Sequence, residues 1–172
     1  FMAGNQLGKT VAGGAEAAMH LTGKYPDWWQ GHRFSGPIVM LAGSESGELT
    51  KAGVQRLLIG PPEDESQWGT GFIPKVDLIE TQRGRGVPDA LDSALVRHAA
   101  GGVSIVHFKS YDQGRGKWQA ATVDLVWFDE EPPGDVYGEA LIRLMTTKGL
   151  MLITFTPLLG MSDVVSMFLG EE

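Results

Sequence analysis

Four residues near the start of the chain, Gly4, Gly8, Lys9 and Thr10, have the types and spacing of a phosphate-binding loop. In the pattern G-x-x-x-x-G-K-[ST], backbone N–H groups and the positive end of the following helix face phosphate oxygens. Lys9 would reach the β- and γ-phosphates, and the Thr10 hydroxyl would bind Mg²⁺. The first glycine of the pattern falls at Ala3, so a plain glycine turn before a helix is the alternative. The residues expected to contact the phosphates are Gly4, Asn5, Gln6, Leu7, Gly8, Lys9 and Thr10.

A pair of carboxylates forms the second candidate site. Asp129 and Glu130 directly follow the apolar, β-prone run Leu125-Val-Trp-Phe. In α/β sheets ligands bind beyond the carboxyl ends of strands, so Asp129 would lie near Mg²⁺ and Glu130 would activate an attacking water. This is the Walker B arrangement. An acidic turn after a strand is common, but the phosphate loop far upstream favours the functional interpretation.

Two threonines end another apolar run, Leu152-Ile-Thr-Phe-Thr-Pro157. Thr154 or Thr156 at the end of a strand could sense the γ-phosphate. Threonine is also an ordinary strand residue, and from the chemistry alone the two interpretations are equally good.

The composition is that of one globular domain. Of the 172 residues, 42% are hydrophobic and 20% are charged, which is enough for a proper core. The net charge of −7 argues against a surface that is basic throughout, so any contact with nucleic acid would be local. The absence of cysteine excludes disulfides, cysteine zinc sites and cysteine nucleophiles. No run is long and apolar enough to span a bilayer, so no membrane contact is expected.

Apolar periodicity and turn residues divide the chain into alternating helices and strands. Helices are expected over 10–21, 48–59, 135–146 and 162–169, the third with Asp135 as its cap and Val136, Ala140, Leu141 and Leu144 facing inward. Strands are expected over 37–42, 103–108, 123–128 and 150–155, with 76–80 as a candidate short strand. The range 89–98 fits either a helical turn or a strand, and 112–120 either a short helix or a loop.

This alternation predicts an α/β fold with a mainly parallel central sheet and helices on both faces. A phosphate loop normally follows a buried strand, and only Phe1, Met2 and Ala3 precede Gly4. We therefore expect the chain to be N-terminally truncated within that strand.

Four stretches carry a resemblance to a known family. In chain order they are GNQLGKT (4–10), FKSYDQGR (108–115), VDLVWFDEEP (123–132) and ITFTPLLG (153–160). They closely resemble the ATPase domain of the terminase large subunit of tailed bacteriophages, in the order and spacing of that family and over nearly the whole chain. The resemblance implies a P-loop NTPase of ASCE (RecA-like) type that hydrolyses ATP with Mg²⁺ and drives viral double-stranded DNA into a procapsid.

The resemblance also implies an organisation and partners. Residues 1–172 would form part of the ATPase domain, without the upstream adenine-contacting segment and the C-terminal RNase H-like nuclease domain. Weak ATP binding and no nuclease activity are therefore expected. Thr154 and Thr156 would belong to the coupling motif that links hydrolysis to motion. The implied partners are double-stranded viral DNA, the portal protein, the small terminase subunit and further copies of the chain in a ring on the portal, in the cytoplasm of the infected bacterial host.

An arginine finger is expected in such a motor, because a guanidinium stabilises charge on the transferring phosphoryl group. Arg115 is the first choice and Arg143 the second; Arg83 and Arg85 are further candidates. Many relatives carry an arginine shortly before the Walker B strand, where this chain has Gln119. For each candidate, a surface or phosphate-contacting role is at least as good an interpretation.

Two small basic groups could contact a DNA backbone: Arg83 with Arg85, and Lys109 with Arg115 and Lys117. Because the chain is acidic overall, solvated loops are the favoured interpretation. The four histidines, His20, His32, His98 and His107, show no spacing typical of metal ligands.

Two other functions stay open. A different P-loop motor, such as a helicase-type translocase, would separate the strands of duplex DNA, whereas a packaging motor moves the duplex unopened. A truncated prophage remnant would assemble with partners as an interaction module and would not hydrolyse ATP.

Overall fold

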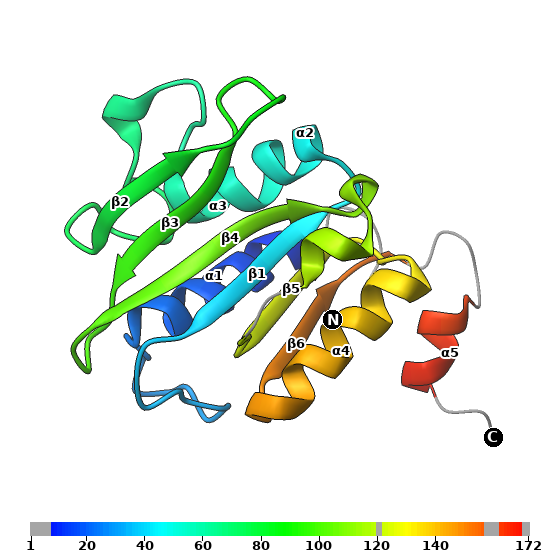
Figure 1. Cartoon of the computed structure of the whole chain (residues 1–172). Helices are drawn as coiled ribbons and strands as arrows, with labels where there is room; N and C mark the ends of the chain where they lie inside the picture. Colours follow the sequence, from blue (N-terminus) through cyan, green and yellow to red (C-terminus); the bar gives the residue numbers. More distant parts are fainter. Residues whose placement is uncertain (1–7, 120–121, 157–161, 170–172) are drawn as a thin grey trace.

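The computed structural model describes residues 8–119, 122–156 and 162–169. Within these residues one six-stranded sheet has helices on both of its faces (Figure 1). The strand order is β2-β3-β4-β1-β5-β6. The strands are β1 (Val39–Ser44), β2 (Leu78–Arg83), β3 (Leu91–Arg97), β4 (Val103–Ser110), β5 (Leu125–Asp129) and β6 (Leu150–Thr154).

The longest helices are α1 (Lys9–Thr22) and α4 (Gly134–Thr147), and α5 (Asp163–Leu169) is shorter. Another helical segment joins α2 (Gly47–Thr50), a π-helical turn (Lys51–Gln55) and α3 (Arg56–Ile59). Short 3₁₀ turns cover Glu65–Gln67, Tyr111–Gln113 and Arg115–Trp118. Among the helices described, none has the length and apolar character needed to cross a membrane.

The sheet is mainly parallel, as predicted. β1 runs parallel to β4 and β5, and β5 runs parallel to β6. An antiparallel hairpin of β2 and β3 extends the sheet beyond β4. The parallel strands end at one edge, where Ser44 is level with Ser110 and Asp129 with Thr154.

Alternating side chains of the central strands fill two separate cores. On β5, Leu125 and Trp127 pack with α1 and the 54–59 helical segment, whereas Val126 and Phe128 pack with α4 and α5. All of these β5 side chains are fully buried. Burial on both faces explains why β5 is apolar without interruption, as parallel strands covered by helices usually are.

The structure corrects several details of the predicted elements. The range 89–98, which fitted either a helical turn or a strand, contains the strand β3 (Leu91–Arg97), and the strand predicted over 37–42 runs from Val39 to Ser44. Pro133, not Asp135, is the N-cap of α4, because the chain enters the helix through an extended proline pair; Asp135 accepts a hydrogen bond from Val136 N inside the first turn. Leu141 is 43% exposed, because the buried stripe of α4 repeats every four residues from Val136 and leaves position 141 beside it.

The helix predicted over 48–59 is helical throughout but contains the π turn. Such turns insert one extra residue and often lie at functional sites. Gln55 at the end of the turn is buried; its Nε2 donates to Asp89 O (2.9 Å) and its Oε1 accepts from Leu91 N (2.9 Å). The turn thereby fixes the loop that enters β3.

Gly43 provides a test of the close strand pairing at the centre of the sheet. A Cβ atom there would lie 2.0 Å from the carbonyl oxygen of Lys109 on β4. We expect Gly43→Ala to lower the free energy of unfolding by about 1–3 kcal/mol through overpacking. Gly138→Ala on α4, where a Cβ meets nothing within 4 Å, should instead raise it by about 0.5–1 kcal/mol. Urea denaturation measures both, and equal midpoints for the two variants would contradict the close pairing.

Candidate active site

The structure describes the predicted phosphate-binding loop only from Gly8 onward. Gly8 has a left-handed backbone (φ 76°) and is the N-cap of α1, which begins at Lys9. Glycine adopts this conformation without steric cost, which allows the chain to turn sharply into the helix. The side chain of Lys9 is buried. The predicted phosphate contacts Gly4, Asn5, Gln6 and Leu7 lie outside the described residues.

Three residues predicted from separate motifs, Thr10, Thr154 and Asp129, meet at one carboxylate oxygen of the aspartate. Thr10 Oγ1 and Thr154 Oγ1 each donate a hydrogen bond of 2.8 Å to Asp129 Oδ1. Asp129 is buried at the end of β5, and Thr154 is buried beside it on β6. Helix α1, which follows the predicted phosphate loop, is therefore joined directly to the ends of two parallel strands.

Trp127 extends this chain of hydrogen bonds. Its Nε1 donates to Thr154 Oγ1 (2.9 Å), so that hydroxyl accepts from the indole and donates to Asp129. Gly13 of α1 lies against the same indole, since a Cβ there would lie 2.8 Å from Trp127 Nε1. The close approach of α1 to the sheet thus depends on a residue without a side chain.

Glu130 has a left-handed backbone with φ 72°, which is uncommon outside glycine and costs on the order of 1–3 kcal/mol. Contacts on three sides hold it. Its N–H donates to Thr154 O (2.8 Å), its Oε2 accepts from Thr156 N (3.4 Å), and its carbonyl oxygen accepts from the Tyr111 hydroxyl (2.7 Å). The strained conformation places the carboxylate at the edge of the sheet beside Asp129.

Burial raises the pKa of both carboxylates. For Asp129, the hydrogen bonds from Thr10 and Thr154 and the Lys9 charge partly oppose this increase in pKa. For Glu130, the Thr156 N–H and the Lys9 charge oppose the increase in pKa. The negative charges of Asp129 and Glu45 add to the increase. Burial, reinforced by the same carboxylates, also raises the pKa of Tyr111 far above its ordinary range. A cation bound here would favour the charged forms of both acids.

The donor set at Asp129 fits Mg²⁺. A hydroxyl and a carboxylate are hard oxygen ligands, and Mg²⁺ is usually held by one or two protein oxygens together with water and substrate phosphates. Gly53 of the π turn faces the second oxygen, Asp129 Oδ2, and a Cβ at Gly53 would lie 3.4 Å from it. The missing side chain leaves space beside that oxygen. The described part of the chain contains no group of three or more acidic or histidine side chains arranged around a metal.

A cavity of about 500 Å³ opens beside Glu130. Four carboxylate residues, Glu45, Glu130, Glu131 and Asp163, contribute to its lining together with Thr156. Ser162, the residue just before α5, donates a hydrogen bond to Glu131, which ties the start of α5 to this wall. The cavity therefore gives the Glu130 side chain open space at this edge of the sheet.

The structure does not bring the candidate arginine fingers to this cavity. Arg143 Nε donates to Glu139 on α4 (2.9 Å). This hydrogen bond is the largest cause that lowers the pKa of Glu139, and the charge of Arg115 also lowers it. Arg83 is paired with Glu65. No arginine lines the cavity among the described residues, so the arginine finger stays a prediction.

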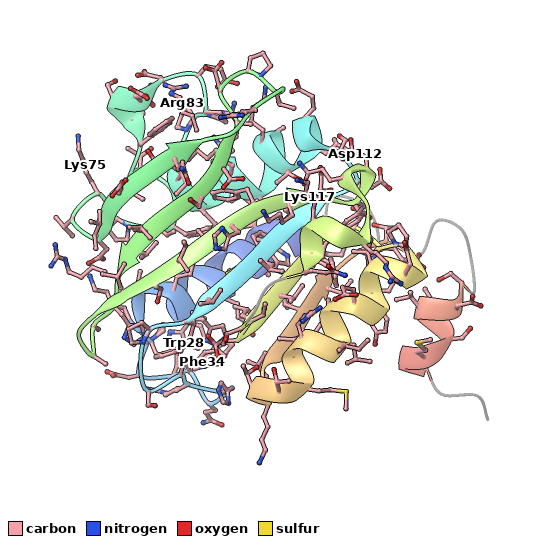
Figure 2. All side chains as sticks on the ribbon, in the orientation of Figure 1. Trp28, Phe34, Lys75, Arg83, Asp112 and Lys117 are labelled. Carbon is pink, nitrogen blue, oxygen red and sulfur yellow. The ribbon has the colours of Figure 1, made fainter. Side chains whose placement is uncertain are left out.

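The two predicted basic groups are brought together in part. A second cavity, of about 390 Å³, lies between the 47–55 helical segment, the loop before β3 and the end of β4. Its lining includes Lys51, Arg85, Lys109 and Lys117; we refer to it as the basic cavity. Figure 2 shows Lys117 near Asp112 at the end of β4, with Arg83 apart from it on the β2–β3 hairpin.

Sequence reasoning missed three contributors to the site: Glu45, Gly53 and Tyr111. Glu45 and Tyr111 each directly follow a parallel strand, as Glu130 does. Strand ends of a parallel sheet share one edge, so this common position is the signal that could have found them. Gly53 had no such signal, because the π turn directs it toward Asp129.

Comparisons with known proteins agree with the resemblance seen in the motifs. A family model described as the terminase large subunit, T4likevirus-type, N-terminal, matches residues 1–172. The terminase large subunit of Salmonella phage P22 is 45% identical over an aligned length of 186 residues. The alignment covers 98% of this chain and 37% of that relative. The chain thus spans well under half of that relative's length. No solved structure gives a significant match. Because the family model matches its full length, this chain belongs to the terminase large subunit family, in the N-terminal region of such proteins.

Proposed function

We propose that this chain is a Mg²⁺-dependent ATPase of the P-loop, ASCE type that drives double-stranded viral DNA into a procapsid. Membership of the terminase large subunit family supports a role in DNA packaging. The observation that carries the ATPase proposal is the meeting of Thr10 and Thr154 at Asp129, next to the strained Glu130. We infer that the portal protein, the small terminase subunit and further copies of the chain are its partners.

In the proposed reaction, the amides of the 4–8 loop and Lys9 bind the ATP phosphates. Thr10 and Asp129 would hold Mg²⁺, which supplies positive charge to the phosphate oxygens. Glu130 orients a water and accepts its proton as the water oxygen attacks the γ-phosphorus in line. The bond between the γ-phosphorus and the oxygen that bridges the β- and γ-phosphates breaks, which releases ADP and phosphate. No covalent enzyme intermediate is needed.

Glu130→Gln tests this reaction. The amide keeps the size of the side chain but cannot accept a proton, so we expect nucleotide affinity to be retained and kcat to fall at least about a hundredfold. Glu80→Gln, at an exposed position of β2, is the control and should hydrolyse ATP like the wild type. Phosphate release and a fluorescent nucleotide analogue measure the two quantities. Full turnover in Glu130→Gln would contradict the role of Glu130 as the proton acceptor. An inactive wild type would favour the non-hydrolysing interaction module.

The Thr154 hydroxyl is proposed to couple the end of β6 to the phosphate site. Thr154→Val removes a donor to Asp129 and leaves Trp127 Nε1–H without its acceptor. We expect the free energy of unfolding to fall by about 1–3 kcal/mol and kcat to fall with it. Thr154→Ser keeps the hydroxyl and should retain most of both. Chemical denaturation and steady-state ATPase assays check this, and equal behaviour of the two variants would rule out a role for the hydroxyl.

We propose that the basic cavity contacts the DNA backbone. Its cations come from separate segments of a chain whose net charge is −7, yet they line one hollow. The wall is also well fixed: Thr50 Oγ1 accepts from Ser44 N (2.9 Å) and donates to Lys109 O (2.8 Å). This joins the helical segment beside the cavity to the ends of β1 and β4. A fixed, locally basic hollow is suited to phosphate contacts that carry no sequence information.

Single alanine substitutions test the basic cavity. Arg85→Ala, Lys109→Ala and Lys117→Ala should each weaken duplex DNA binding and reduce the slope of log K against log salt by about 1. Lys75→Ala is the control, because Lys75 lies far from Lys117, on the opposite side of the view in Figure 2. Fluorescence anisotropy over a range of KCl concentrations measures the slopes. Unchanged slopes in all three variants would place the DNA contact elsewhere, and strand separation of the duplex would favour the helicase-type translocase.

A further inference from the structure

We propose that Tyr111 positions Glu130 for ATP hydrolysis by holding the peptide group that follows it. The inference rests on the proposed function, in which Glu130 accepts the proton of the attacking water. Tyr111 itself touches neither water nor nucleotide in this scheme. It is a positioning residue that acts through the backbone of Glu130.

The Tyr111 hydroxyl is buried at the shared edge of the sheet. Its oxygen lies 2.7 Å from Glu130 O and 3.2 Å from Asp129 O. A phenol has one hydrogen to donate, and the shorter distance assigns it mainly to Glu130 O. The hydroxyl therefore binds the backbone on the carboxyl side of Glu130.

This contact matters because the Glu130 backbone is left-handed. Its N–H is fixed by Thr154 O on β6, and its carbonyl oxygen is fixed by Tyr111. An unusual conformation persists only where the surroundings determine it from several sides. Without the hydroxyl, one of the bonds that hold the left-handed backbone of Glu130 is lost, and relaxation of that backbone at Cα would redirect the side chain that carries the carboxylate.

Tyr111 is itself firmly placed. Its ring packs against Phe128 (centroids 5.7 Å apart) and Trp118 (5.8 Å). A capping box formed by Ser110 and Gln113 closes the short 3₁₀ turn that carries it. The next residue, Asp112, donates its N–H to Glu45 O (3.2 Å). The Tyr111 hydroxyl is therefore held in a fixed position next to the carbonyl oxygen of Glu130.

The test is Tyr111→Phe, which keeps the ring contacts and removes the hydrogen bond. We expect kcat to fall about ten- to a hundredfold, as for a misplaced catalytic group, while the KM and Kd for ATP change less than about twofold. Tyr25→Phe is the matched control. It removes a partly buried hydroxyl that bonds Phe34 N (2.9 Å) in the loop after α1, outside the proposed site, and should leave kcat unchanged. Circular dichroism and thermal unfolding verify that both variants are folded.

The double variant Glu130→Gln/Tyr111→Phe separates positioning from a general structural role. If Tyr111 acts through Glu130, the double variant should be no slower than Glu130→Gln alone, because the carboxylate that Tyr111 positions is already absent. Losses that multiply, or a wild-type kcat in Tyr111→Phe beside an inactive Glu130→Gln, would overturn this inference and leave the proposed function intact. Full turnover in Glu130→Gln would instead overturn the proposed function itself.

Discussion

The structure of the site depends on one buried carboxylate oxygen, Asp129 Oδ1. It accepts hydrogen bonds from Thr10 at the start of α1 and from Thr154 at the end of β6, and Asp129 itself ends β5. A buried charged oxygen that loses a donor is costly, since hydrogen bonds to charged groups contribute about 1.5–3 kcal/mol each. The relative positions of α1 and of two parallel strands are therefore fixed by hydrogen bonds to one oxygen atom.

Backbone geometry at three positions also determines the shape of the site. Gly8 and Glu130 are both left-handed, but only glycine adopts that conformation freely. The backbone at Gly8 therefore turns at no steric cost, whereas neighbouring hydrogen bonds must offset the steric cost of the left-handed backbone at Glu130. Gly13 adds a third constraint, because α1 can lie against Trp127 only where no side chain intervenes. The apolar strands position the site, and these three backbone positions define its shape.

Motifs with a local mechanism could be predicted from the sequence. Lys9, Thr10, Asp129 and Thr154 follow from a loop pattern and from polar residues at the ends of apolar runs, and the structure brings the last three together. The parallel sheet also followed from uninterrupted apolar strands that are buried on both faces.

The remainder depended on the order of the strands in space, which no local pattern contains. Tyr111 is far from Glu130 in the sequence, and their contact exists because β1 lies between β4 and β5. The β3 strand was ambiguous because its short run fits either period. The π turn that directs Gly53 toward Asp129 has no local signature at all.

The segment that follows β4 has neighbours on both sides. Ser110, Gln113 and Lys117 border the basic cavity, and Tyr111, between the first two, reaches the other way to the backbone of Glu130. The two 3₁₀ turns that make up this segment are short, and Trp118 anchors its far end in the core. Contacts of Tyr111 and Trp118 hold this segment against the sheet. The basic cavity and the peptide that follows Glu130 therefore share one short stretch of chain, with no intervening domain or long helix between them.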